Sequence, residues 1–364
     1  MPLAWVPYTD RAEAERRLNG IPAGLELDFY RAEGDELPGS LDEVAFYVLP
    51  YMKGTAVLDR AADMPKLQVV QTLTAGYEEF LPLVPPGVTL CNAAGLHDTS
   101  TAELALALAL ASGRHLDEFA RNQPSGTWRF AFGRALADQR VLIVGYGHIG
   151  HAIEHRLNGF EVASITRVAR RARTGPPEVH PIEELHRLLP NADVTFVIAP
   201  YTPQTEGMIG ARELALLPDG ALLVNVARGK LVDTDALVAA LETGRIRAAL
   251  DVTDPEPLPP DHPLWRQPGA LISPHVGGAS SAFFPRADRL MAAQLDRFMA
   301  GQPLENVVKA GQGGLRRVRP RRPARRSGRR WPAGCRGRRT RRCGRGRARR
   351  SDRRPGRWRA GARS

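Results

Sequence analysis

Short apolar runs alternate with helical patterns along the first 310 residues of the chain. The runs are rich in Val, Ile, Leu and Phe and are bounded by Gly, Pro or polar residues, which is typical of strands. Seven of them are Glu43–Pro50, Leu67–Thr74, Gly87–Gly95, Asp193–Pro200, Gly220–Ala227, Ile246–Thr253 and Ala270–Gly277. Near-continuous apolar strands separated by helices predict parallel, doubly wound sheets covered on both faces.

Three segments before, between and after these strands have the pattern of a helix. Thr9–Gly20 begins at a candidate capping residue, and both Thr9–Gly20 and Thr234–Gly244 end at a glycine. Pro285–Gly301 is amphipathic, and we expect it to pack back against the first strands of the chain.

A fourth helical segment precedes the central glycine loop. We expect Ser100 or Thr101 to cap it and Glu103 to lie in its first turn. Its apolar run, Ala102–Ala111, is too short to span a bilayer and predicts a core helix.

The net charge of +12 is unevenly distributed. From Gly311 onward the chain holds 23 arginines and a single acid, Asp352, so this tail carries +22 and the body −10. Two of the three cysteines also lie in the tail, which leaves Cys91 in the body. Few cysteines and the absence of a signal-peptide pattern favour the cytoplasm and argue against a disulfide framework or a membrane anchor.

The arginine-rich tail, residues 310–364, is predicted to be disordered because it has almost no aliphatic side chains. Three interpretations are open: an arm that binds nucleic acid non-specifically through phosphates, a solvated tail, or out-of-frame translation of a gene end. Selected basic arms usually mix Lys with Arg, and this one has no Lys, so we favour the third and assign the tail no catalytic role.

The segment "VLIVGYGHIG" has three glycines spaced G-x-G-x-x-G between a strand and a helix. Gly145 permits a tight turn, Gly147 a close approach of the backbone to a pyrophosphate, and Gly150 close packing of helix and strand. The free N–H groups of the following helix favour an anion. The sequence therefore predicts a dinucleotide site.

The strand after this helix carries arginines where NAD-binding proteins carry an acid. In Phe160–Arg173 no acid follows Glu161. Arginines suit a 2′-phosphate, so NADP(H) is favoured and NAD(H) stays open. Arg167 and Arg170 are the best candidates for that contact.

Three later segments, "NVARGKLVD", "DVTDPEPL" and "SPHVGG", supply an arginine, an acid and a histidine at the ends of predicted strands. Hydride transfer to a carbonyl beside a carboxylate requires a cation, a proton donor and a group that keeps the donor protonated. Arg228, His275 and Glu256 meet these requirements.

With the glycine loop, these segments resemble the D-isomer-specific 2-hydroxyacid dehydrogenase family from about residue 40 to residue 308. The resemblance implies that Arg228 binds the substrate carboxylate and carbonyl, and that His275, paired with Glu256, is the general acid or base. Gln stands at the Glu256 position in formate-oxidising relatives, so that branch is not expected. The other histidines are expected to be structural.

The glycine loop and the two arginines inferred above, together with what the resemblance implies, give the residues expected to contact cofactor and substrate. The cofactor set is Gly145, Tyr146, Gly147, His148, Ile149, Gly150, Arg167, Arg170, Ala199, Pro200, Thr205, Val226, Ala227, Asp251 and Gly277. The substrate set is Pro50, Tyr51, Ala75, Gly76 and Arg228, with the loop "TLTAGYE" holding the carboxylate through its N–H groups. No metal is implied.

We therefore predict an α/β protein with two doubly wound parallel-sheet, Rossmann-like domains, the cofactor domain inserted into the substrate domain. The expected boundaries are 1–96 plus 284–309 for substrate and 97–283 for the dinucleotide. The expected substrate resembles glyoxylate, hydroxypyruvate or 3-phosphoglycerate, and a homodimer through the cofactor domain is implied. The alternatives are a dinucleotide-sensing corepressor on the same fold and a nucleic-acid binder.

Overall fold

Two separate sheets organise the part of the chain that the structure describes. The structure is a computed structural model in which residues 1–34 and 36–311 are described. The predicted arginine-rich tail lies outside the described residues, so the interpretations of it stay predictions.

The first sheet has six strands in the order β13-β5-β4-β3-β1-β2. All neighbours are parallel except β13, which runs antiparallel to β5. The strands are β1 (Leu3–Val6), β2 (Glu26–Phe29), β3 (Val44–Val48), β4 (Val69–Gln71), β5 (Thr89–Cys91) and β13 (Val307–Lys309). The two strands before residue 43 were not expected from the sequence; β2 has the sequence ELDF, in which charged and apolar residues alternate and no residue is fully buried.

The second sheet has seven strands in the order β12-β11-β10-β9-β6-β7-β8, all parallel. They are β6 (Arg140–Val144), β7 (Ser164–Ala169), β8 (His180–Pro181), β9 (Val194–Val197), β10 (Leu222–Asn225), β11 (Arg247–Leu250) and β12 (Ala270–Ile272). The predicted fold class, doubly wound and Rossmann-like, is confirmed.

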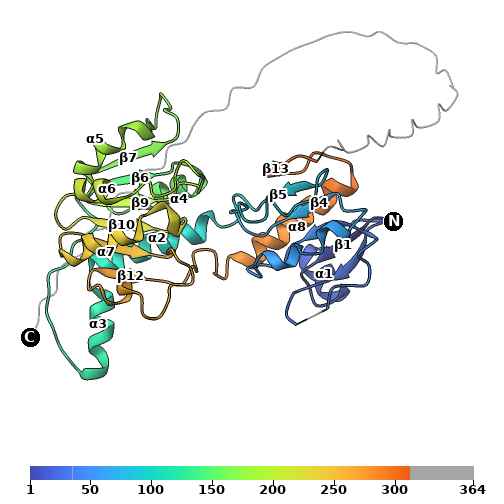
Figure 1. The fold of residues 1–364 in the computed structure, drawn as a ribbon, viewed down its shortest axis with the longest axis horizontal. Coiled ribbons are helices and arrows are strands. Elements are labelled where there is room, and N and C mark those ends of the chain that lie inside the picture. The colour runs from blue at the N-terminus through green and yellow to red at the C-terminus, as the bar shows by residue number, and fades with distance from the viewer. Residues whose placement is uncertain (35, 312–364) are drawn as a thin grey trace, which may run out of the picture. The chain divides into compact units, whose positions relative to one another are not determined.

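Helices cover both sheets (Figure 1). The α-helices are α1 (Arg11–Leu18), α2 (Asp98–Gly113), α3 (Leu116–Asn122), α4 (His148–Leu157), α5 (Leu185–Leu188), α6 (Ala211–Leu216), α7 (Thr234–Glu242) and α8 (Phe283–Met299). Short 3-10 turns are η1 (Thr55–Leu58), η2 (Ala61–Asp63), η3 (Gln123–Ser125), η4 (Ile182–Glu184), η5 (Leu189–Asn191), η6 (Gly229–Leu231) and η7 (Pro263–Arg266). Within the described ranges, no helix has the length and apolar character needed to cross a membrane.

Each sheet separates two hydrophobic cores because successive strand residues point to opposite faces. In β6, Val141 and Ile143 face the core that contains α2 and α4, whereas Leu142 and Val144 face the core that contains α5, α6 and α7. The strands are therefore apolar at almost every position, as the sequence pattern indicated.

The capping prediction for α2 was wrong. The helix begins at Asp98, so Ser100 and Thr101 already lie inside it, and the exposed Glu103 lies beyond its first residues. The Ser100 hydroxyl instead bonds the Ser280 hydroxyl at 2.7 Å. The helical segment also breaks at His115, whose φ of 57° is left-handed, and α3 follows.

The helix near the end of the body returns to the start of the chain, as predicted. In Figure 1 the orange α8 lies among the blue elements of the first sheet. Its residues Phe283, Met291 and Phe298 share a core with Val6 and Phe46.

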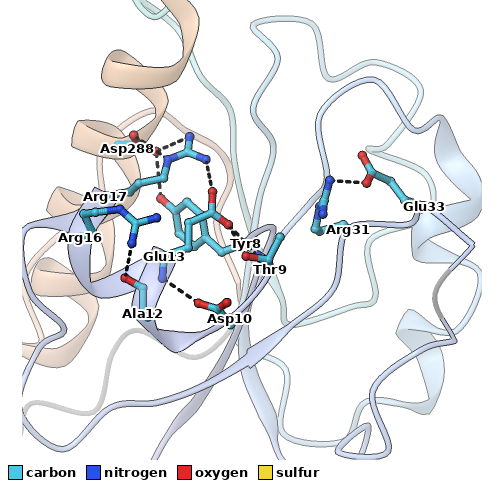
Figure 2. A network of polar contacts seen from close by, with 10 residues as sticks. All are labelled: Tyr8, Thr9, Asp10, Ala12, Glu13, Arg16, Arg17, Arg31, Glu33 and Asp288. Atoms are coloured by element: carbon cyan, nitrogen blue, oxygen red, sulfur yellow. Dashed lines mark hydrogen bonds and ion pairs between the residues drawn. The ribbon is translucent and has the colours of Figure 1, made fainter.

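A polar network joins α8 to α1 (Figure 2). The Arg17 guanidinium lies between Glu13 and Asp288, at 2.9 Å from an oxygen of each. The Tyr8 hydroxyl donates to Asp288 at 3.0 Å. The network connects segments that are 280 residues apart in sequence. Water has little access to Asp288, because its side chain is only 13% exposed.

We predict that Asp288→Asn destabilises the protein by about 1–2 kcal/mol, because Arg17 would lose a charged partner at a largely buried site. Urea denaturation of the full chain measures this. The control is Glu15→Gln, because the side chains of the Glu15–Arg11 ion pair are both more than half exposed. This substitution should change the free energy of unfolding by less than about 0.5 kcal/mol. Equal effects of the two changes would contradict a special role for the network.

Candidate active site

Loops from five parallel strands meet at one edge of the second sheet, because parallel strands all end on the same side. The glycine loop follows β6 and the segment at Ala199 follows β9. Arg228, Asp251 and His275 follow β10, β11 and β12 respectively. The strands thus bring together residues that are far apart in sequence.

The glycine loop has the shape that a dinucleotide requires. Gly145 has a φ of +106°, and a Cβ there would overlap the backbone between Ile198 and Ala199. A Cβ on Gly150 would lie 2.6 Å from the Gly145 carbonyl oxygen. At Gly147, by contrast, a Cβ would meet nothing within 4 Å. Open space therefore faces the start of α4, where helix N–H groups attract a pyrophosphate.

The other loop residues have different surroundings. The Tyr146 side chain is only 4% exposed and its hydroxyl bonds Glu154, so only its backbone is placed to meet a ligand. Ile149 packs against the core under α4. His148 is 75% exposed, with Nδ1 3.4 Å from the Asp98 carboxylate.

The two arginines predicted to bind the 2′-phosphate have different surroundings, because β7 ends between them. Arg167 lies inside the strand and its Nε donates to Glu154 at 2.6 Å, so its guanidinium is held toward α4. That ion pair lowers the pKa of Glu154 and raises the pKa of Arg167. Arg170 and Arg171 lie just beyond the strand and are exposed. Arg173 donates to the Tyr146 carbonyl and so connects this segment to the glycine loop.

The remaining predicted cofactor residues lie on neighbouring loops. The backbone of Ala199 abuts Gly145. Thr205 closes the turn that follows, since its hydroxyl donates to the Pro200 carbonyl at 2.8 Å. Val226 and Ala227 extend β10 toward Arg228 and are buried.

A buried amide shapes the turn that carries Arg228. Asn225 is 1% exposed, accepts from the Ala227 N–H at 3.1 Å and donates to the Arg228 carbonyl at 2.9 Å. The next residue must be small, because a Cβ on Gly229 would overlap the Thr253 carbonyl. The Arg228 side chain is 37% exposed and lies against Gly76 and near Glu78.

Asp251 holds the loop that carries His275. Its carboxylate is 1% exposed and accepts from the Ser273 hydroxyl at 2.6 Å, the Val276 N–H at 2.9 Å and the Gly277 N–H at 2.7 Å. These bonds turn the chain away from the sheet after Ile272, so the predicted strand 270–277 ends early. The structure therefore makes Asp251 a positioning residue, and its predicted contact with the cofactor stays a prediction.

His275 and Glu256 form the pair that the sequence indicated. The His275 Nδ1 lies 2.5 Å from the Glu256 Oε1. Burial opposes ionisation of Glu256, but the bond to His275 and the charges of His275 and Arg228 lower its pKa. An ionised carboxylate at Nδ1 fixes the proton there, so Nε2 is the nitrogen left to exchange a proton with a substrate.

The loop after β4 offers free donors. Neither the Ala75 nor the Gly76 N–H donates a hydrogen bond to any described residue. The loop is held by its other atoms: Asn92 donates to the Ala75 carbonyl at 2.7 Å and the Thr74 hydroxyl to the Gly76 carbonyl at 2.6 Å.

Aromatic side chains support this loop. Pro50 and Tyr51 follow β3, and the Tyr51 ring packs on Phe283 with centroids 4.1 Å apart. Burial and the charge of Asp251 raise the pKa of Tyr51, so its hydroxyl keeps its proton. His97 stacks in parallel with Phe283 and bonds the Leu73 carbonyl at 2.9 Å.

Sequence reasoning missed the roles of three residues. His97 was expected to be merely structural, yet it holds the loop after β4. Asn225 and Glu78 received no role, although both belong to segments that we had quoted as motifs. A buried amide directly after an apolar strand was the available signal for Asn225.

This arrangement can bind and protonate a 2-oxo acid. The Arg228 guanidinium and the loop N–H groups are donors suited to a carboxylate, and the His275 Nε2 is suited to exchange a proton with the oxygen of a neighbouring carbonyl. A nicotinamide dinucleotide held at the glycine loop would supply the hydride. No cluster of three or more His, Cys, Asp or Glu within residues 1–34 and 36–311 is placed to hold a metal.

Comparison with known proteins supports this interpretation. Residues 106–277 match the family model for the D-isomer specific 2-hydroxyacid dehydrogenase, NAD binding domain. A glyoxylate reductase from Korarchaeum cryptofilum is 32% identical over 321 residues, covering 83% of this chain and 95% of the relative.

Two solved structures are similar as well. A D-isomer specific 2-hydroxyacid dehydrogenase from Xanthobacter autotrophicus, in complex with NADPH and MES, has a TM-score of 0.69 and 30% identity over 85% of this chain and 98% of its own. An NADPH-dependent glyoxylate/hydroxypyruvate reductase from Sinorhizobium meliloti has a TM-score of 0.70 and 27% identity over the same shares. The chain thus belongs to the D-isomer specific 2-hydroxyacid dehydrogenase family and is an NAD(P)-dependent oxidoreductase that transfers a hydride between a nicotinamide and a small 2-hydroxy or 2-oxo acid.

Proposed function

We propose that the protein reduces glyoxylate or hydroxypyruvate with NADPH. The observation that carries the proposal is the 2.5 Å contact between His275 and Glu256 on the same sheet edge as Arg228. These groups supply the proton donor and the anion site for a small 2-oxo acid. The names of the relatives support the choice of substrate. The Cys-poor body favours a cytoplasmic setting.

The preference for NADPH is supported by the end of β7. No acid is present in residues 164–171 to accept bonds from a ribose 2′-hydroxyl. We assign the 2′-phosphate to Arg170 and Arg171, because the guanidinium of Arg167 is bound to Glu154. The similar structures from Xanthobacter and Sinorhizobium were obtained with, or are named for, NADPH.

We further propose a homodimer that forms through the segment after α3. Trp128, Phe130 and Phe132 are 98%, 78% and 90% exposed, and Leu116 is 53% exposed. Phe130 and Phe132 pack against each other with ring centroids 5.2 Å apart, and a monomer rarely leaves such exposed aromatic side chains uncovered. A second copy of the chain is the partner that the family resemblance implies.

We expect His275→Ala to lower kcat for glyoxylate reduction by about 100-fold or more, because the proton donor is lost. Glu256→Gln should cost about tenfold or more at pH 7, and the loss should shrink as the pH falls. The pKa of Glu256 lies below its usual value, so the wild-type carboxylate is ionised at neutral pH and loses its charge only when the pH falls through that lowered pKa. Below it, the wild type no longer has the charge that Gln lacks. Steady-state rates from about pH 3.5 to 9 measure both effects.

The control is His262→Gln, because this histidine precedes η7 as its N-cap, where its Nδ1 accepts from the Leu264 N–H. It should keep a wild-type profile. A Glu256→Gln profile parallel to that of the wild type at all pH values would show that the pair does not set the proton donor.

Replacing Arg170 and Arg171 together with Ala should raise the KM for NADPH by about tenfold or more and leave the KM for NADH within about twofold, because only NADPH carries the 2′-phosphate. Fluorescence titration of both cofactors gives a readout independent of turnover. Arg212→Ala, an exposed arginine on α6, should change neither value. Equal weakening of the two cofactors would argue against a 2′-phosphate contact.

Replacing Trp128 and Phe132 together with Ser should convert a dimer into a monomer, because the apolar area that drives association would be removed. Light scattering after size exclusion gives the mass. Leu83→Ser, at another exposed apolar position, should leave the mass unchanged. A wild-type protein that is monomeric at micromolar concentration would refute the proposal.

A further inference from the structure

Glu78 places a carboxylate of the chain itself in the substrate site. Its Oε2 accepts from the Tyr77 N–H at 2.9 Å and lies 3.8 Å from the Arg228 Nη2. A Cβ built on Gly76 would lie 3.1 Å from the same oxygen and would overlap the Arg228 guanidinium. The carboxylate thus lies beside the loop and the cation that are expected to hold a substrate carboxylate.

Within the described residues, Glu78 is the one acidic side chain that lies within ion-pair distance of Arg228. The Arg228 Nη1 donates to the Ala227 carbonyl at 2.7 Å. The gap of 3.8 Å is wider than a hydrogen bond, so Glu78 attracts Arg228 without being fixed to it. The Glu78 side chain is 31% exposed, so water or a small anion can reach it.

The charges around this position disfavour a second negative charge. Glu78 lies beside Arg228 on the loop after β4. Glu256, on the loop after β11, is near enough for the Arg228 charge to help lower its pKa. The positive charge of Arg228 is therefore already felt by two carboxylates. A monoanionic ligand brings one negative charge, which Arg228 attracts. A dianionic ligand brings a second negative charge, which both carboxylates repel.

We propose that Glu78 is the resident anion of the substrate site: it occupies the place of the substrate carboxylate beside Arg228, is displaced on binding, and selects monoanionic 2-oxo acids over dianionic ones. This inference rests on the proposed function for the identity of the site and goes beyond it in naming the residue that sets charge selectivity. Glu78 acts through repulsion and competition, and it is not a group that exchanges protons with the substrate.

Oxamate and oxalate provide matched probes, because they have nearly the same size and shape and differ by one charge. Calorimetry of the full-length protein gives the dissociation constant of each without turnover. In Glu78→Gln we expect both anions to bind more tightly, and the preference for oxalate over oxamate to rise by about tenfold relative to the wild type. The amide oxygen still accepts from the Tyr77 N–H, so the loop is preserved.

The matched control is Glu79→Gln, the same charge change one residue along the loop on an exposed side chain. It should leave the oxalate-to-oxamate ratio within about twofold of the wild type. Glu78→Ala is the second variant, with the same expected sign, and thermal melting checks the fold of each. If Glu78 had a merely structural role, its replacement would weaken the binding of both anions equally and leave the ratio of their affinities unchanged.

An unchanged ratio in both Glu78 variants, or a Glu78→Gln protein that binds neither anion, overturns the proposal. Failure of the proposed function gives a different result. In that case wild-type protein would not oxidise NADPH with glyoxylate, while the ratio of anion affinities would still respond to Glu78.

Discussion

The active site depends on the buried carboxylate of Asp251. It accepts three bonds from the segment that follows β12, two of them from backbone N–H groups. These bonds hold His275 at a φ of 52°, a left-handed conformation that costs a non-glycine residue about 1–2 kcal/mol. Bonds to a charged acceptor in a dry environment are strong enough to offset that cost. The strained backbone turns the imidazole toward Glu256.

The same sheet edge explains how distant segments become one site. Asn225 shapes the turn after β10 as Asp251 shapes the loop after β12, and in both cases one buried polar side chain satisfies the backbone of a loop. Loops fixed in this way keep Arg228 and His275 in place before any ligand arrives. Such preorganisation reduces the free energy that is needed to order the groups during reaction.

The sequence predicted the parts of the structure that depend on local pattern. Apolar runs located most strands, because both faces of each sheet are buried, and the spacing of Gly145, Gly147 and Gly150 predicted the loop. The sequence did not predict features that are determined by contacts between residues distant in the chain. Nothing local distinguishes the guanidinium of Arg167 from that of Arg170, yet the register of β7 puts one against Glu154 and the other beyond the strand.

Two glutamates near Arg228 have opposite effects on the chemistry. Glu256 bonds the His275 Nδ1 and so fixes the imidazole that we propose as the proton donor. Glu78 accepts from the Tyr77 N–H and lies beside the cation that a substrate must reach, so its charge opposes a second anion. Both side chains carry the same negative charge. They differ in the group that the fold places beside each one, which is His275 for Glu256 and Arg228 for Glu78. Residue type alone therefore could not identify Glu78, because its role follows from the positions of Gly76 and Arg228 across the site.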